Sequence, residues 1–366
     1  MHNDGPVVIV GHSLVAPENR LPFPEAWPDC VLIFPRTWRS PGNPHVYGPV
    51  KKSKTEIPLP TIGLRHNTLF AYRYLARTLD SLHPRLIYIW EEPWSLPVRQ
   101  VRLWAQSKGI PWLFFSAENR PKILPRPFAS LRNKAFEKAS GAIVPTEEIR
   151  DNLMRQGYAG PVYEIPLWIT ARRRLIPASH STVAFIGRFI ALKRIDLLLQ
   201  ATALLPEIKL RLIGDGPEDT RLRRLARQLR IQDRVEFCGH VPNHELENTL
   251  QGCALVALPT GQNPRQAEQF GKAVLDGILS GLPVLVSDSG HLSHWAREFA
   301  TVALANCSSP DALAQSIART LEAGFPPQAL VEAYEKAQKR YGPQAASLHF
   351  KQAFADTLSR HARRSS

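Results

Sequence analysis

Two carboxylates flank a Phe-Gly pair in the segment of this sequence that most clearly predicts chemistry. Glu268 precedes Phe270 and Gly271, and Asp276 follows eight residues after the glutamate. We expect a helix to start near Gly271, where unpaired backbone N–H groups and a missing side chain suit a diphosphate. Asp276 would then lie roughly 7 to 8 Å further along the helix, at ~1.5 Å per residue. The two acids therefore lie on either side of an expected phosphate site.

The types of these residues predict a nucleotide diphosphate sugar as the ligand. Carboxylates repel phosphate but accept hydrogen bonds from hydroxyl groups, so we expect Glu268 to bind the sugar and Asp276 the ribose. Two cations, Arg188 and Lys193, follow a strand-like run in "AFIGRFIALKRIDLLL". We expect them to hold the same phosphates from a facing loop and to offset the acids without a metal ion.

Two glycine-containing turns complete the predicted donor site. The turns "IGDGP" at 213–217 and "FCGHV" at 237–241 both end strand-like runs of the second half. We expect their backbones, including Gly214, Gly216 and Val241, to border the ribose and the base.

The composition is that of a globular protein with a basic surface. The chain has 366 residues, 44% of them hydrophobic and 21% charged, and Lys and Arg outnumber Asp and Glu by 46 to 32, a formal charge of +14. This excess favours anionic partners. No apolar run is long enough for a membrane span, and the first residues do not resemble a secretion signal. The cysteines are isolated, so we expect neither a disulfide nor a zinc site.

Short apolar runs alternate with segments of helical period along the whole chain, which predicts parallel α/β layers. Helix-like segments include "NTLFAYRYLARTL" at 67–79 and "PDALAQSIARTLEAG" at 310–324, the latter capped by Ser309. A stretch near 168–181 has no sustained period and is expected to be a linker. We predict two doubly wound Rossmann-like domains that face each other across a cleft, with ligands at the carboxyl ends of the strands. The expected ranges are 1–170, 181–340 and a final helix at 341–366 that crosses back to the first domain.

The segments "GRFIALKRIDLLLQA", "LRLIGDGP", "VEFCGHV" and "EQFGKAVLDGILSGLPVLVSDSG" resemble the C-terminal half of family 4 glycosyltransferases of GT-B fold. "IYIWEEPWSL" and "WLFFSAENRPKILPRPF" resemble acceptor-domain segments of bacterial polysaccharide-building members. The resemblance implies metal-independent, retaining transfer of a sugar from an NDP-sugar, by front-side displacement in which Arg188, Lys193 and Glu268 serve the reaction. This sequence departs from the family pattern at Asp276, where relatives have a glutamate.

Four residues of the first half are candidates for the acceptor side. Glu91 and Glu92 lie at an expected strand end, where either acceptor contacts or ion pairs with neighbouring arginines would explain them. Many relatives have a histidine where this chain has none, and Asn119 is the candidate to replace it. His12 lies in the segment that replaces a glycine-rich loop of the family, although a lone histidine is more often a packed or surface residue.

Two rival functions stay open beside a glycosyltransferase. An NDP-sugar epimerase of the same fold would use similar phosphate contacts but no acceptor, and a non-catalytic anion-binding protein would rest on the charge alone. Nucleic acid is not expected, because the basic groups are not interleaved with aromatic residues. We expect a saccharide or lipid-linked acceptor, a cytoplasmic location, and docking of the basic surface to the anionic inner face of the cytoplasmic membrane.

Overall fold

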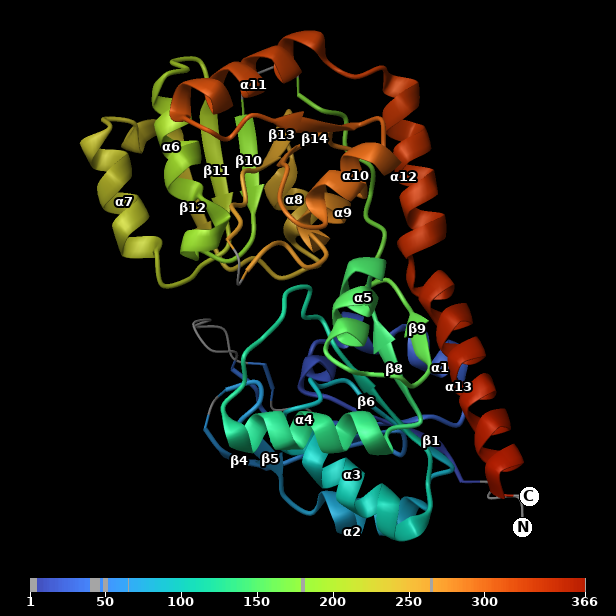
Figure 1. Ribbon diagram of the computed structural model, residues 1–366. Helices are drawn as coiled ribbons and strands as arrows, with labels where there is room; N and C mark the ends of the chain where they lie inside the picture. Colours follow the sequence, from blue (N-terminus) through green and yellow to red (C-terminus); the bar gives the residue numbers. More distant parts are fainter. Residues whose placement is uncertain are drawn as a thin grey trace. The chain divides into compact units, whose positions relative to one another are not determined.

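The computed structural model describes residues 5–39, 47–48, 52–64, 66–178, 182–263 and 266–365. The chain divides into two compact units (Figure 1). The first comprises Met1–Trp168 together with Pro343–Ser366, and the second comprises Ile169–Gly342. The first unit is therefore built from both ends of the chain.

A parallel sheet of seven strands, in the order β3-β2-β1-β6-β7-β8-β9, forms the centre of the first unit. Its strands are almost continuous apolar runs, as expected for a parallel sheet buried on both faces. A separate antiparallel pair, β4 and β5, lies beside it. The strands are β1 Val7–Val10, β2 Val31–Pro35, β3 Glu56–Leu59, β4 Thr61–Gly63, β5 Phe70–Tyr72, β6 Leu86–Ile89, β7 Trp112–Phe115, β8 Gly141–Val144 and β9 Val162–Glu164.

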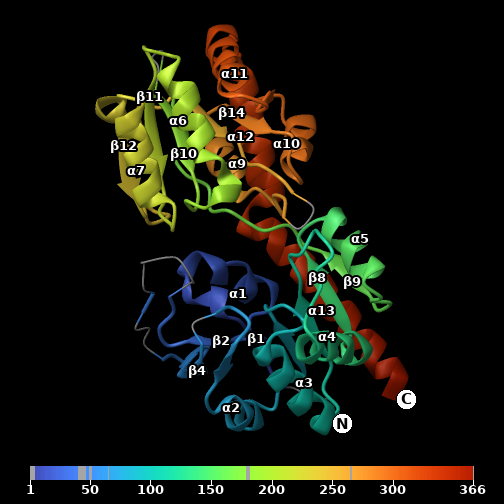
Figure 2. The same ribbon diagram turned by 60° about the vertical axis from the view of Figure 1, so that its left-hand side comes forward.

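Helices cover both faces of this sheet because successive strand side chains point to opposite sides. Val8 and Val10 pack into one core cluster with residues of α2, α3, α4 and α5. Val7 and Ile9 pack into the other, with residues of α1 and of the final helix α13 (Figure 2). The helices are η1 His12–Val15, η2 Pro17–Arg20, α1 Pro22–Ala26, α2 Leu75–Leu82, α3 Leu96–Lys108, α4 Arg126–Lys138, α5 Glu147–Arg155 and α13 Pro343–Ser365.

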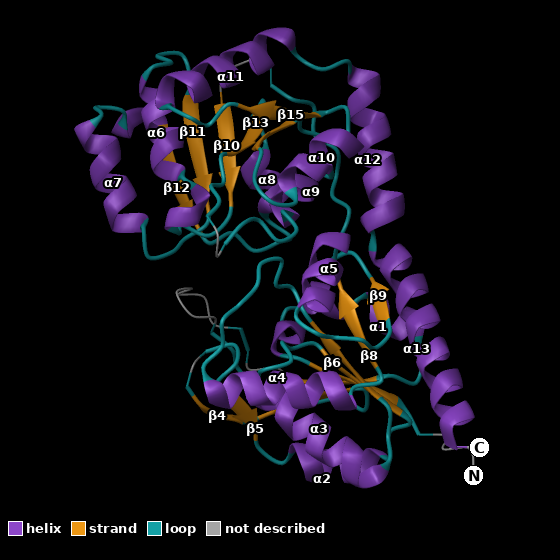
Figure 3. Cartoon of the chain, in the orientation of Figure 1, coloured by secondary structure: helices purple, strands orange, loops and turns teal. Residues whose placement is uncertain are grey.

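The second unit has a parallel sheet of six strands in the order β12-β11-β10-β13-β14-β15, with helices around it (Figure 3). Helix α6 packs against α7 and α11, and α9 packs against α12. The strands are β10 Thr182–Ile186, β11 Lys209–Ile213, β12 Val235–Gly239, β13 Leu255–Leu258, β14 Val284–Ser287 and β15 Val302–Ala305. The helices are η3 Ala191–Lys193, α6 Ile195–Ala203, α7 Asp219–Gln228, η4 Gln232–Arg234, α8 Leu246–Leu250, α9 Lys272–Ile278, α10 Leu292–Glu298, α11 Pro310–Ala323 and α12 Pro327–Tyr341.

Each sheet has one point at which the order of its strands reverses. In the first unit this switch point lies between β1 and β6, which pair in parallel with Val10 opposite Ile89. In the second unit it lies between β10 and β13, with Val183 opposite Leu255. Ligands of open α/β sheets bind outside the carboxyl ends of the strands at such points. We therefore expect the functional residues in the loops that follow β1, β6, β10 and β13.

One predicted helix is wrong. Residues 67–79 were expected to be helical throughout, but Phe70–Tyr72 forms β5 and the helix α2 begins only at Leu75. The two rings of Phe70 and Tyr72 are buried against the first sheet. Burial of aromatic side chains in a short strand pair has outweighed the helical spacing of the leucines.

The described part of the chain was also searched for membrane spans. It contains no helix whose length and apolar character would suffice to traverse a lipid bilayer.

Candidate functional site

The switch point of the second unit holds a lysine–glutamate ion pair. Lys193 ends η3 in the loop after β10, and Glu268 lies in the loop between β13 and α9. The ammonium group of Lys193 donates a hydrogen bond to the carboxylate of Glu268, 75 residues away in sequence. The two side chains are only 18% and 15% exposed. Two residues predicted separately from the sequence are thus brought into direct contact where a parallel sheet binds ligands.

A second ion pair involves Asp276, which lies within α9. Nη2 of Arg172 is 2.7 Å from Oδ1 of Asp276 and also donates to the side-chain oxygen of Asn243 in the loop after β12. The Arg172 side chain is only 6% exposed. Its Nε and Nη1 are buried and have no hydrogen-bond partner within the part of the chain that the structure describes. Arg172 therefore links Asp276, which is predicted to bind the ribose, with the loop after β12.

The sequence analysis missed Arg172. It belongs to the run "ARRR" at 171–174, which has the composition of a solvated loop. Its neighbour Arg173 follows that pattern, because its side chain is exposed and pairs with Glu247. The hydroxyl of Tyr334 donates to the Arg172 carbonyl oxygen at 2.6 Å and helps to hold this segment in the second unit. A local pattern of charges could not distinguish the buried arginine from the exposed one.

Helix α9 begins where the sequence predicts, with Gly271 as its N-cap at φ 78°. A side chain here would be strained at this φ and would also collide with Leu292, whose Cδ2 would lie 2.7 Å from a Cβ atom. Phe270 packs its ring 5.3 Å from that of Trp295, and Trp295 Nε1 donates to the Phe270 carbonyl oxygen at 2.6 Å. The Phe270 side chain is therefore a core anchor, and only its backbone is available to a ligand.

The two glycines of the "IGDGP" turn allow neighbouring loops to pack closely. A Cβ atom on Gly214 would lie 1.9 Å from the carbonyl oxygen of Gly187, and one on Gly216 would lie 2.5 Å from that of Phe189. The Phe189 amide donates to the Asp215 carbonyl oxygen at 2.7 Å. Both glycines thus have a packing role in the loop after β10 that is independent of any ligand.

Arg188 and Val241 are the remaining predicted residues of the second unit. Arg188 lies in the loop after β10 with an exposed side chain, and Val241 is half-buried just beyond the end of β12. The predicted donor residues therefore all lie in loops at the carboxyl ends of the parallel strands or in α9.

The switch point of the first unit holds a histidine–glutamate pair. His12 begins η1 after β1, and Glu91 follows β6. Nδ1 of His12 is 2.8 Å from both carboxylate oxygens of Glu91, and the His12 backbone N–H donates to Oε1 at 2.7 Å. Glu91 is almost fully buried. The carboxylate thus accepts hydrogen bonds from the backbone N–H and from Nδ1, and these contacts fix the orientation of the imidazole ring.

Glu92 directly follows Glu91, and Asn119 lies in the loop after β7, the neighbour of β6 in the sheet. The Glu92 carboxylate accepts hydrogen bonds from the Ser116 hydroxyl at 2.9 Å and from the Ala117 N–H at 2.8 Å, both in the loop after β7. Burial, and next the negative charge of Glu118, raise the pKa of Glu92 to about 8. Asn119 is buried in the same loop.

The alternative that Glu91 and Glu92 form ion pairs with arginines is wrong for the described residues. Glu91 pairs with His12, and Glu92 accepts hydrogen bonds from Ser116 and Ala117. The role of these acids on the acceptor side stays a prediction.

The described residues contain no group of three or more His, Cys, Asp or Glu side chains placed to hold a metal ion. That the reaction needs no metal ion is implied by the resemblance and stays a prediction.

Comparison with known proteins finds a match between the second unit and a family model. Residues 169–340 match the family model described as "Glycosyl transferases group 1". Over 191 residues the chain is 32% identical to a D-inositol 3-phosphate glycosyltransferase of Mycolicibacterium smegmatis, a match that covers 45% of this chain and 42% of the relative. The match thus spans less than half the length of this curated relative.

Solved structures resemble the chain along almost its whole length. Sucrose-phosphate synthase from Thermosynechococcus elongatus has a TM-score of 0.72 at 18% identity, with 97% of this chain and 99% of that chain covered. Anabaena HepE in complex with UDP and glucose has a TM-score of 0.71 at 15% identity, again with 97% and 99% covered. The predicted GT-B class, with two doubly wound Rossmann-like units, is confirmed, and the second unit matches glycosyl transferases group 1 over residues 169–340.

Proposed function

We propose that this protein is a retaining glycosyltransferase that moves a sugar from an NDP-sugar to a hydroxyl group of a saccharide or lipid-linked saccharide. The observation that supports this proposal most directly is the Lys193–Glu268 pair. It lies at the switch point of a unit that matches glycosyl transferases group 1. A cation and a carboxylate side by side suit a ligand that presents phosphate oxygens and sugar hydroxyls next to each other.

The pair gives the predicted contacts to the phosphate and to the sugar a physical basis. The Lys193 ammonium group has three N–H donors and can hold Glu268 and a phosphate oxygen at once. Glu268 then has lone pairs left for hydroxyl groups of the sugar. The exposed Arg188 adds a second cation in the same loop. These side chains compensate the charge of a diphosphate.

The nucleoside part of the donor is assigned to Asp276 and Arg172. Oδ1 of Asp276 accepts from Arg172, which fixes the orientation of the carboxylate. We propose that the other oxygen accepts a hydrogen bond from a ribose hydroxyl. The side chain of Asp276 is one methylene group shorter than the glutamate of relatives. A carboxylate that is held in one orientation is therefore more important here. The backbones of Gly214, Gly216 and Val241 are proposed to border the ribose and the base.

The proposed reaction is a front-side displacement at the anomeric carbon. The acceptor oxygen forms a bond to this carbon while the bond from the carbon to the diphosphate oxygen breaks, and the NDP leaves with the electron pair. The leaving diphosphate helps to take the acceptor proton. The protein contributes electrostatically, because Arg188, Lys193 and the start of α9 stabilise the negative charge that grows on the leaving group.

The acceptor and its location are proposed from charge and from the relatives. The curated relative is named for D-inositol 3-phosphate, so cyclitol phosphates belong in an acceptor screen beside saccharides and lipid-linked saccharides. The formal charge of +14 supports docking to an anionic membrane surface, where each Lys or Arg contributes about 1 kcal/mol. Co-sedimentation with phosphatidylglycerol vesicles at low and high salt tests this docking, and no association at low salt would contradict it.

Ligand-induced stabilisation tests the proposed function. We expect one of UDP, GDP and ADP to raise the melting temperature, and one of its sugars to do so as well, because a ligand that binds only the folded state stabilises it. Transfer assays with the selected NDP-sugar then identify the acceptor, and NMR of the product reports whether the anomeric configuration is retained. Epimer formation without an acceptor would instead indicate an epimerase. Binding of nucleic acid without any nucleotide-sugar binding would contradict the proposal.

A further inference from the structure

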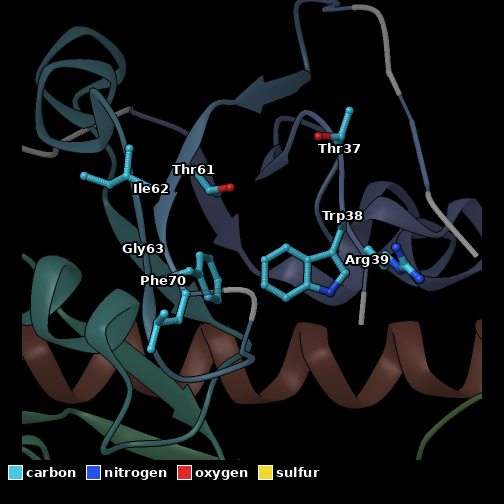
Figure 4. A pocket seen from close by; sticks show the side chains of 8 residues that line it. Thr37, Trp38, Arg39, Thr61, Ile62, Gly63 and Phe70 are labelled. Atoms are coloured by element: carbon cyan, nitrogen blue, oxygen red, sulfur yellow. The ribbon is translucent and has the colours of Figure 1, made fainter. Parts of the chain in front are cut away.

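Two buried tryptophans of the chain use their indole N–H groups differently. Trp38 lines a hollow of about 260 Å³ in the first unit (Figure 4), and its buried Nε1 has no hydrogen-bond partner among the residues that the structure describes. Trp295 of α10 is fully buried in the second unit, and its Nε1 donates to the Phe270 carbonyl oxygen at 2.6 Å. Phe270 lies two residues after Glu268, so the indole of Trp295 holds the backbone of the loop that carries a candidate donor contact.

The residues just before α10 hold Glu268 in the same way, by its backbone. The His291 N–H donates to the Glu268 carbonyl oxygen at 3.0 Å. Gly290 has φ 54°, and a Cβ atom there would collide with the same carbonyl oxygen. Position 290 therefore needs a glycine, because the two backbones approach each other too closely for a side chain.

Two aromatic rings hold the side chain of Phe270. The His291 ring stacks on the Phe270 ring, with centroids 5.8 Å apart and planes 10° apart. The Trp295 ring meets the Phe270 ring edge to face, at 5.3 Å and 89°. Burial, and next the neighbouring His294, lower the pKa of His291 to about 3, so its ring is neutral at neutral pH. The loop is thus held by two hydrogen bonds to its backbone and by a ring packed between two others.

Helix α10 is itself fixed on α12, so it can act as a rigid support for the loop. The rings of Trp295 and Tyr341 have their centroids 5.0 Å apart. The Tyr341 hydroxyl donates to Oε2 of Glu298 at 2.7 Å, and Nη1 of Arg340 lies 3.0 Å from Oε1. The Glu298 side chain is only 5% exposed. Trp295 therefore links the loop of Glu268 to the end of a helix that is held by buried polar contacts.

We propose that Trp295 is a positioning residue of the donor site, which holds the Glu268 carboxylate in place beside Lys193 through the backbone of Phe270. The carboxylate accepts a hydrogen bond from Lys193, and the orientation of its remaining lone pairs depends on the position of the loop backbone. A loop that shifts would turn the carboxylate away from the sugar hydroxyls, whereas the nucleotide would keep its other contacts. Trp295 thus acts on the sugar part of the donor. This inference rests on the proposed function, because Glu268 is the proposed contact to the sugar.

Calorimetric titrations of the protein with UDP, GDP and ADP, and with UDP-glucose, GDP-mannose and ADP-glucose, test this role. Trp295→Phe keeps an aromatic ring but loses the indole N–H. We expect it to weaken binding of the NDP-sugar about 3- to 10-fold, the size of one lost hydrogen bond, and to leave binding of the corresponding nucleotide within about 2-fold. A loss of stability alone would not change the ratio of the two affinities.

Trp168→Phe is the matched control. Trp168 is a buried tryptophan of the first unit whose Nε1 donates to the Glu18 carbonyl oxygen at 3.0 Å, so this variant loses the same kind of hydrogen bond. We expect it to leave both affinities unchanged. Melting temperatures without ligand show that each variant is folded.

A double-mutant cycle shows whether Trp295 acts through Glu268. Glu268→Gln should itself weaken binding of the NDP-sugar. In that background Trp295→Phe should add less than about 2-fold, because two residues that serve one contact are not additive. Full additivity of the two changes would overturn the inference.

His291 provides a second test that does not depend on a tryptophan variant. His291→Ala removes the ring that stacks on Phe270 and should weaken binding of the NDP-sugar more than binding of the nucleotide. His291→Phe keeps a neutral ring and should restore the affinity. An unchanged ratio of the two affinities in the folded variants Trp295→Phe and His291→Ala, while the nucleotide still binds, would overturn this inference alone; if Trp295→Phe does not fold, the ratio in His291→Ala decides. Failure of every probe to bind the unmodified protein would overturn the proposed function, and this inference with it.

Discussion

The two units place different kinds of hydrogen-bonded pair at equivalent points of the same architecture. In the second unit the pair is Lys193 with Glu268, and in the first it is His12 with Glu91. In both, one partner follows the first strand of the sheet and the other follows the strand across the switch point. A lysine side chain carries an ammonium group with three N–H donors, whereas a histidine side chain carries an imidazole ring whose nitrogens can donate or accept a hydrogen bond. The comparison teaches that one topology can place side chains of different chemistry at the same point of its two sheets.

The two pairs also differ in what surrounds them. The second unit adds another ion pair, Arg172 with Asp276, in which the arginine is deeply buried. The first unit surrounds His12 with the aromatic rings of Trp38 and Phe70. A charged ligand needs compensating charges, and a ring with hydroxyl groups needs an apolar face and a few oriented dipoles. The surroundings of the two pairs therefore differ as well, with a further charged pair in one unit and aromatic rings in the other.

The largest expected effect concerns the fixed charge of the second unit. The variant Lys193→Ala lacks the cation that is proposed to stabilise the negative charge on the leaving group, so turnover should fall about 100- to 1,000-fold. Steady-state transfer rates measure this change. The control variant Lys209→Ala removes an exposed lysine at the start of β11. This end of the strand is opposite to the carboxyl edge that carries the site, so the variant should keep its transfer activity. Equal activity of the two variants would contradict a role for the pair in the reaction.

The second prediction tests whether the buried arginine supports the charge arrangement of the second unit. Arg172→Ala leaves the Asp276 carboxylate without its partner, so the free energy of unfolding should fall by about 3 to 5 kcal/mol. Arg173→Ala breaks a pair whose arginine is 65% exposed, and should cost less than about 1 kcal/mol. Urea denaturation of both variants measures the difference. Similar losses for the two arginines would mean that Arg172 is not held as the structure describes.

The third prediction concerns a titratable group of the first unit. Burial raises the pKa of Glu92 from 4.5 to about 8, so the folded state binds a proton that the unfolded state releases between these values. Stability should therefore fall as pH rises from about 5 to 8. Glu92→Gln cannot lose this proton, so its stability relative to the unmodified protein should improve over the same range. Urea denaturation at pH 5, 6.5 and 8 measures this, and parallel curves would contradict a raised pKa.

Much of the architecture could be predicted because its signals are local. The strand-like runs are continuous apolar segments bounded by glycine, proline or polar residues, and they form the two parallel sheets. The Ser309 side chain accepts a hydrogen bond from the Ala312 N–H at 3.1 Å, as its position before Pro310 predicts for an N-cap. Residues 67–79 show where local signals are not sufficient for prediction. The short strand β5 forms because it pairs with β4 and packs into the core, and neither partner is part of its own sequence.

The partners within the candidate site could not be predicted, because they are far apart in sequence. Glu91 contacts His12 over a separation of 79 residues, and Arg172 contacts Asp276 over 104. Residue types and strand ends predicted His12, Glu91 and Asp276 individually. Which group each of them meets depends on the order of strands in the sheets and on the packing of the segment after Ile169. Arg172 had no local signal that separated it from the arginines on either side.

The final helix has a consequence for how the molecule is made. Phe350 and Phe354 of α13 pack with Phe23 and Tyr88, so the first unit lacks part of its core until α13 has been synthesised. The second unit is one continuous segment and can fold while the ribosome is still adding α13. We therefore expect a product truncated before residue 343 to expose aromatic rings of the first unit and to aggregate.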